Sequence, residues 1–466
     1  MNKPKDTADP STDAGWRREA ASVSLPEVYR TITVTSNMSF WRKLLAFSGP
    51  GFLVAVGYMD PGNWATDLAG GAKFGYTLLC VVLISNFMAI LLQHLCVKLG
   101  VATGRDLAQA CRDHYSTPTV WFLWVLCEIA IAACDLAEVV GSAIGLQLLF
   151  GIPLVWGCVI TAADVLLVLF LQHKGFRYIE AIVITLILTI GGCFAVELLF
   201  SKPDLAGVVR GFIPSPEILR NQQMLYVSIG ILGATVMPHN LYLHSSIVQT
   251  RNFERTLEGK REAIKFATID SSFALMTALF INGAILVLAA SAFHWSGHQD
   301  VAEIQDAYKL LSPLLGVGLA STLFAVALLA SGQNSTLTGT LAGQIVMEGF
   351  LNFRISPWLR RMITRLIAII PAVGIIAYYG EGKTTELLVA SQVVLSMQLG
   401  FAVWPLMRFT GERAKMGRFV NPVWIKVLGW TTTIVIITLN LKLLLDTFLP
   451  ETILKTFYGF FGLPPA

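Results

Sequence analysis

The feature that most constrains this chain is a series of long apolar stretches, each able to cross a membrane as a helix. A spanning helix needs about 20 mostly apolar residues. We predict eleven spans, at residues 45–72, 75–99, 119–148, 153–172, 178–200, 224–250, 264–293, 312–343, 361–380, 384–409 and 422–448. Only 14% of the residues are charged, whereas a soluble domain carries about 25%. The sequence therefore predicts an all-α polytopic membrane protein.

The basic residues between the spans predict how the chain sits in the membrane. If the N-terminus is cytoplasmic, 26 of the 34 Lys and Arg residues fall on the inner side. Cytoplasmic loops carry the excess of basic residues. We therefore expect a multi-pass protein of the plasma (inner) membrane with a cytoplasmic N-terminus, and eleven spans then put the C-terminus in the extracellular or periplasmic space.

The rest of the chain is divided around these spans. Residues 1–43 are polar and lack the apolar core of a signal peptide, so we expect a disordered cytoplasmic tail. Residues 411–466 hold the eleventh helix and a short extracellular C-terminus. The seven cysteines show no zinc or disulfide spacing, and we interpret them as small buried apolar residues. The scattered basic residues do not suggest a nucleic-acid partner.

Two spans are interrupted at comparable places by a proline. The first span reads Gly57-Tyr58-Met59-Asp60-Pro61-Gly62-Asn63, and the sixth reads Ala234-Thr235-Val236-Met237-Pro238-His239-Asn240. Proline removes a backbone donor and clashes with the preceding turn, so each helix should break or kink there. One proline kink is common in membrane helices, but two matching ones divide the chain into spans 1–5 (residues 44–200) and 6–10 (residues 221–410). Since five is odd, these units form an inverted repeat, with a binding site at the two broken helices.

The two interruptions carry groups that suit a metal cation. Asp60 lies near mid-span, where a carboxylate is costly and is functional by default, although a structural hydrogen bond or a protonated acid is the alternative. Asn63 offers an amide oxygen, Met237 a thioether, and the unwound backbone at Gly57 and Ala234 offers carbonyls. Oxygen ligands alone suit Ca²⁺ or Mg²⁺, whereas a thioether favours transition metals. We predict selection of Mn²⁺ or Fe²⁺ over Mg²⁺ and Ca²⁺.

Titratable side chains near the interruptions suggest protons as the coupling ion. Asp60 can release a proton when it binds a cation. His239 and His244 follow the second interruption and titrate near neutral pH. We place all three on the proton pathway.

A second group of acids lies in span 3. Glu128, Asp135 and Glu138 fall within about 80° of one helix face. We predict a proton pathway through them, with basic partners such as Arg251. The alternative is a static network of ion pairs, and for Glu128 this interpretation is as well supported as the proton pathway.

Three further polar residues lie inside spans: Asn86, Asn282 and Gln392. Each either lines the permeation route or forms a hydrogen bond between helices, and the second use is the commoner one.

Three segments together resemble the Nramp family of divalent-metal transporters, in particular its bacterial manganese transporters. They are Asp60-Pro61-Gly62-Asn63, Met237-Pro238-His239 and residues 332–349, and the resemblance covers nearly all of 45–448. It implies a LeuT-like fold and proton-coupled uptake of Mn²⁺, with Fe²⁺, Co²⁺, Zn²⁺ and Cd²⁺ as further substrates. It also implies metal-ligating side chains at Asp60, Asn63 and Met237, carbonyl donors at Gly57 and Ala234, a ligand in some conformations at Gln392, and proton-linked positions at His239, Asp135, Glu138 and Arg251.

Other functions fit the sequence less well. A sodium-coupled symporter of a small organic solute has the same repeat, but the acidic Asp60 argues against an anionic substrate group at the break. A membrane metalloenzyme needs a clustered motif such as H-E-x-x-H, which does not occur. A channel suits paired broken helices less than a gated carrier does. We therefore expect a monomeric importer without a resident cofactor, working by alternating access, and not an enzyme.

Overall fold

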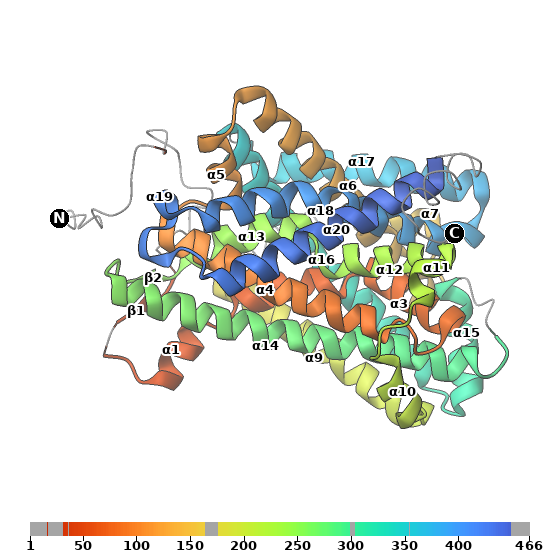
Figure 1. Cartoon of the computed structure of the whole chain (residues 1–466). Coiled ribbons are helices and arrows are strands. Elements are labelled where there is room, and N and C mark those ends of the chain that lie inside the picture. The colour runs from red at the N-terminus through yellow and green to blue at the C-terminus, as the bar shows by residue number, and fades with distance from the viewer. Residues whose placement is uncertain are drawn as a thin grey trace.

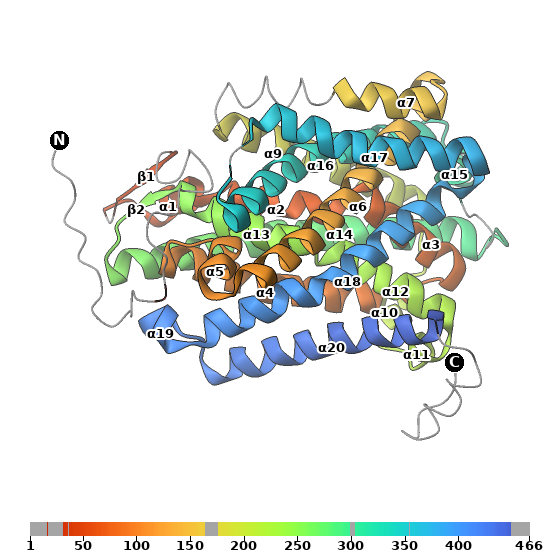
Figure 2. The same cartoon turned by 90° about the horizontal axis from the view of Figure 1, so that it is seen from above.

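The computed structural model describes residues 16, 31–35, 37–163, 176–298, 303–353 and 355–448. Long helices lie side by side along one axis of the molecule (Figure 1). They are α4 (Leu79–Thr103), α6 (Thr117–Phe150), α9 (Phe176–Ser201), α14 (Leu257–Ala289), α16 (Ala320–Leu351), α17 (Pro357–Tyr379), α18 (Thr384–Gly411) and α20 (Val423–Phe448). Seen from above, α20 lies along one side of this bundle and α17 along the opposite side (Figure 2).

The predicted all-α membrane fold is confirmed. Eight helical segments of the described chain are long and apolar enough to cross a membrane, and they match predicted spans 2, 3, 5, 6, 7, 9, 10 and 11. The helix α16 occupies the place of span 8. For span 4 the structure describes α7 (Leu154–Ile160) and η3 (Thr161–Ala163), and residues 164–172 lie outside the described residues. The total of eleven spans stays a prediction.

Both predicted interruptions are present. In span 1, α2 (Pro50–Val56) continues into the 3₁₀ turn η2 (Gly57–Met59), and α3 (Pro61–Phe74) begins after Asp60, whose backbone is extended. In span 6, α12 (Gln222–Thr235) and α13 (Pro238–Ile247) are separated by Val236 and the extended Met237. In both cases proline is the first residue of the new helix, where its missing N–H costs nothing.

Two sequence predictions are wrong in their boundaries. Span 8 does not begin at 312. Residues 312–315 belong to a separate helix, α15 (Ile304–Leu315), which ends at Gly316 in a left-handed conformation (φ +68°). The predicted disordered tail of residues 1–43 is wrong at its end. The strand β1 (Thr33–Val34) pairs in parallel with β2 (Asn252–Phe253), and α1 (Phe40–Phe47) follows it.

The short elements gather at the two ends of the bundle. One end holds β1, β2, α1, α5 (Leu107–His114) and α19 (Arg413–Met416) (Figure 1). The other end holds α7, α10 (Leu205–Gly211), α11 (Glu217–Arg220) and α15. Apart from α7, which begins predicted span 4, these elements lie in segments predicted to face the cytoplasm and the exterior, respectively. We call the two ends the inner and the outer end.

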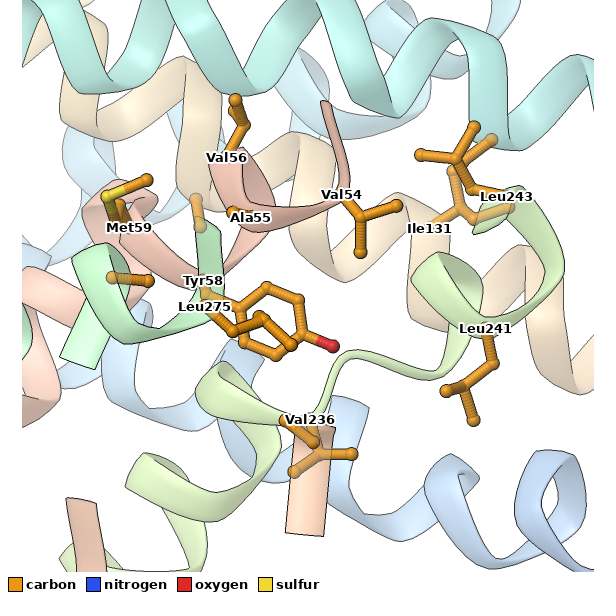
Figure 3. Close-up of a cluster of buried hydrophobic side chains, with 14 of the residues drawn as sticks. Val54, Ala55, Val56, Tyr58, Met59, Ile131, Val236, Leu241, Leu243 and Leu275 are labelled. Atoms are coloured by element: carbon orange, nitrogen blue, oxygen red, sulfur yellow. The ribbon is translucent and has the colours of Figure 1, made fainter. Parts of the chain in front are cut away.

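The two interruptions lie within the apolar core. Side chains of the first interrupted helix, such as Val54 and Tyr58, share one buried cluster with Val236 and Leu241 of the second (Figure 3). Apolar burial of this kind is the main stabilising contribution to such packing. The core therefore holds the unwound segments of the two helices close together.

Candidate metal-binding site

Asp60 is fully buried and begins α3 as its N-cap. Its Oδ1 accepts a hydrogen bond from the Asn63 backbone N–H at 2.8 Å, which satisfies one of the free donors at the start of this helix. Asn63 is 1% exposed, and its side-chain oxygen has no hydrogen-bond partner. The first interruption thus presents one carboxylate and one unpaired amide oxygen in the protein interior.

Met237 brings the second interruption to the same place. It is fully buried and packs in a small cluster with Ala130, Cys134 and Leu395. The Cys134 thiol in turn lies 3.9 Å from Oδ2 of Asp60. A Cβ placed on Gly57 would lie only 3.2 Å from the Met237 sulfur, so the backbone of the first break and this thioether are neighbours.

Gln392 of α18 completes this neighbourhood. Its side chain lies against Gly62, where a Cβ would come within 2.9 Å of the Gln392 Cγ, so any larger residue at position 62 would force the Gln392 side chain to move. The Gln392 Oε1 has no hydrogen-bond partner. Ala234 lies in the last turn of α12, where backbone carbonyls lack helical donors. Both residues therefore lie beside the two interruptions, and their role as metal ligands stays a prediction.

The donor set is mixed and mostly neutral. It contains one carboxylate, amide and carbonyl oxygens, a thioether and a thiol. In the described part of the chain, no group of three or more His, Cys, Asp or Glu side chains is placed to hold a metal ion. Such a mixed set suits a borderline transition-metal ion better than Mg²⁺ or Ca²⁺, which prefer oxygen alone.

The acids of span 3 form ion pairs with α17. Arg361 binds Asp135 at 2.6 Å and Glu138 at 3.1 Å, and Arg360 binds Glu128 at 2.8 Å. Neither arginine was predicted from the sequence as a partner of these acids. The signal was present, because basic residues at the start of an apolar span require partners.

Arg251 is not the partner of these acids, and that expectation is wrong. Its guanidinium binds Glu180 of α9 at 2.7 Å and donates to the carbonyls of Ala46 and Ser48, at 2.8 and 3.0 Å. These carbonyls precede α2. Arg251 therefore ties the beginning of the first interrupted helix to α9 at the inner end.

The two predicted histidines occupy different surroundings. His239 is 2% exposed, and its Nδ1 has no hydrogen-bond partner. His244 Nδ1 lies 2.9 Å from the Gln93 side-chain oxygen, and the Gln93 amide donates to the Tyr58 hydroxyl at 2.7 Å. His244 is thereby linked through one glutamine to the first interruption.

The remaining polar residues differ in their contacts. The Asn282 amide donates to the Tyr58 carbonyl at 2.8 Å and so braces the first interruption. The Asn86 amide lies 3.9 Å from the Met276 sulfur of α14, a contact between helices. Only Asn282 of these two touches an unwound segment.

The sequence model of one family matches most of this chain. That family is described as natural resistance-associated macrophage protein-like, or Nramp, and it matches residues 51–446. The chain belongs to the Nramp family.

Named relatives of this Nramp chain cover almost its full length. It is 68% identical over 424 residues to the divalent metal cation transporter MntH of Nostoc sp., covering 91% of this chain and 96% of the relative. It is 62% identical over 436 residues to the protein of the same name from Listeria monocytogenes serotype 4a, covering 94% and 97%. These relatives are named as transporters and not as enzymes.

Solved structures agree with the fold. A manganese transporter of Eremococcus coleocola, 42% identical, superposes with a TM-score of 0.83 and covers 96% of this chain and 93% of its own. MhsT in complex with L-phenylalanine is only 13% identical but has a TM-score of 0.57 over 85% of this chain and 97% of its own. At this low identity, the match to MhsT shows the fold alone. The predicted LeuT-like fold is thereby confirmed.

Proposed function

We propose that this Nramp-family chain is a proton-coupled secondary transporter that imports divalent transition-metal ions by alternating access. Mn²⁺ and Fe²⁺ are the main substrates in this proposal, with Co²⁺, Zn²⁺ and Cd²⁺ as further ones. Relatives named as divalent metal cation transporters support the substrate class. The observation that carries the proposal is the meeting of Asp60, Met237 and the Gly57 backbone between two broken helices.

The donor set explains how an ion could be selected. The carboxylate of Asp60 supplies the negative charge, and the unpaired oxygens of Asn63 and Gln392 replace water ligands. Met237 adds a sulfur atom, which binds transition metals usefully and Ca²⁺ poorly. Because Asp60 is the only ionisable oxygen ligand in this set, the ion keeps part of its charge and is able to leave again.

Proton coupling follows from the same carboxyl group. A dication that binds Asp60 competes with its proton, so loading of metal and release of a proton are linked. Cys134 lies 3.8 Å from the Glu138 carboxylate as well as beside Asp60. We propose that the proton passes from Asp60 toward Glu138, Asp135 and Glu128, with His239 and His244 as further members of the pathway.

Alternating access requires the interrupted helices to move. At the inner end, Asp270 of α14 accepts hydrogen bonds from the Gly51 and Gly49 backbone N–H groups, at 2.7 and 3.3 Å. Together with Arg251 and Glu180, it holds the start of α2 in place. We propose that these contacts break when the site opens to the cytoplasm.

The remaining parts of the proposal concern the setting of the protein. We propose an inner-membrane protein with its N-terminus in the cytoplasm and its C-terminus outside, acting as a monomer without a resident cofactor. The excess of basic residues on the predicted inner side supports this orientation.

Uptake into proteoliposomes tests the proposed function. We expect entry of Mn²⁺ that is faster with acid outside, with little entry of Mg²⁺ or Ca²⁺, and loss of uptake in Asp60→Ala. Solute uptake that follows a Na⁺ gradient, without metal entry, would instead favour the alternative of a sodium-coupled symporter.

A further inference from the structure

Glu197 is a buried acid that the proposed metal and proton sites do not use. It lies in the last two turns of α9 and is fully buried. Both of its carboxyl oxygens are without a hydrogen-bond partner. Among the described residues, no other acidic side chain has two buried oxygens that both lack a hydrogen-bond partner.

Among the described residues, no cation forms an ion pair with Glu197. The helix α9 packs against α14, α16 and α2. The charged residues of α14 lie in its first half, between Glu258 and Asp270, α16 carries only Glu348 near its inner end, and α2 carries none. On α9 itself, Arg177, Tyr178 and Glu180 lie at the inner end, and the Cys193 thiol is one turn away from Glu197.

The physical consequence is that these surroundings disfavour a negative charge on this carboxyl group. An ionised carboxylate loses its hydration on burial, and that loss is repaid only by a cation or by several hydrogen bonds. Glu197 has neither among the described residues. Such a residue is expensive within a membrane, and it is a functional candidate for that reason.

Glu197 lies one turn from a contact with α3, the second half of the first interrupted helix. Phe194, one turn before it, packs against Trp64 of α3 with 4.7 Å between ring centroids. Trp64 follows Asn63 directly, and beyond it α3 carries Asp67 and Lys73. A movement of α3 that opens the outer half of the bundle would therefore change the surroundings of Glu197.

We propose that Glu197 is a proton-binding site of the transport cycle and that it is separate from Asp60. Glu197 binds its proton when the outer halves of α3, α9 and α14 close. The site empties when that region opens to water. This inference rests on the proposed function, because it requires a cycle of opening and closing. Closure then takes up a proton from outside, so external acid favours the closed, loaded transporter.

The sign of the pH effect follows directly. At high external pH the open form of the wild-type protein loses the Glu197 proton and closes less readily, so uptake slows. Glu197→Gln keeps the shape of the neutral side chain but cannot lose a proton. Its uptake should therefore depend less on pH than wild-type uptake does.

The test compares Mn²⁺ uptake by proteoliposomes at external pH values of about 5.5 and about 7.5. We expect the ratio of the two rates to fall at least twofold in Glu197→Gln, and to stay at its wild-type value in the matched control Glu217→Gln, an exposed glutamate at the outer end. An unchanged ratio in a Glu197→Gln protein that transports Mn²⁺ would overturn the proposal. Absence of Mn²⁺ uptake by the wild-type protein would instead overturn the proposed function.

Infrared difference spectra give a second readout that does not need the glutamine variant to transport. Raising the pH of the wild-type protein should remove the carbonyl band of a protonated carboxyl group. Glu197→Asp should shift this band and Glu197→Gln should abolish it. A band that is the same in the wild type and in Glu197→Asp contradicts the assignment.

Discussion

The Cys134 thiol lies 3.9 Å from the Asp60 carboxylate and 3.8 Å from the Glu138 carboxylate. One side chain of α6 thus joins the first helix break to the acids of the proposed proton pathway. Because Met237 packs against the same cysteine, two sulfur atoms border the proposed site.

The position of this thiol predicts how soft metals bind. Cys134→Ala should weaken Cd²⁺ binding by about tenfold, or ~1.4 kcal/mol, and change Ca²⁺ binding little, because thiolates and thioethers prefer softer ions. Competition binding to purified protein measures both. Cys158→Ala, at a buried thiol of α7, is the control, and equal losses in the two variants would argue against a role for Cys134.

Met237 carries the predicted preference for transition metals over Ca²⁺. Met237→Ala should weaken Mn²⁺ and Cd²⁺ binding and narrow the preference over Ca²⁺, since the remaining donors are nearly all oxygens. Uptake of Mn²⁺ in the presence of excess Ca²⁺ measures this preference. Met407→Ala removes an equally buried methionine of α18 and should leave it unchanged. The same selectivity in Met237→Ala and wild type would exclude a role for the thioether.

Arg361 is expected to matter for stability as well as for proton movement. Arg361→Met leaves the buried carboxylate of Asp135 without its nearest cation and leaves Glu138 with Arg365 alone, at 3.5 Å, which should cost about 3–5 kcal/mol. Thermal unfolding in detergent measures the loss. Lys309→Met breaks an exposed pair with Asp306, which is worth at most about 1 kcal/mol. If both variants unfold at the same temperature, the α6–α17 pairs do not have the importance assigned to them.

Arg251 and Glu180 are expected to control opening at the inner end. Arg251→Met removes the hydrogen bonds to the residues before α2, so the inward-open form should become more populated. Modification of Ala55→Cys by a thiol reagent from the inner side should then be faster. Lys43→Met, which breaks a half-exposed pair with Glu262 at the same end, should have a smaller effect. Slower labelling in Arg251→Met would contradict this role.

Local sequence features predicted much of the fold. Apolar stretches of sufficient length predicted the spanning helices, and a proline after Asp60 and after Met237 predicted the two breaks. Each of these features acts within one or two helical turns. The start of α16 was misplaced because the apolar pattern continues through the turn at Gly316.

Pairings between distant segments could not be predicted in the same way. Arg361 is 226 residues from Asp135 and Arg251 is 71 residues from Glu180, so only the packing of the helices identifies these partners. The role of Cys134 was missed for a similar reason. A buried cysteine is usually a packing residue, and only its contact with Asp60 distinguishes it.

We propose above that Asp60, Asn63 and Met237 bind one ion between the broken helices. Anomalous scattering from Mn²⁺ in crystals of this protein tests it most directly. We expect a single strong peak within bonding distance of the Asp60 and Asn63 oxygens and the Met237 sulfur. A transport-competent protein whose Mn²⁺ peak touches none of these three side chains would contradict it.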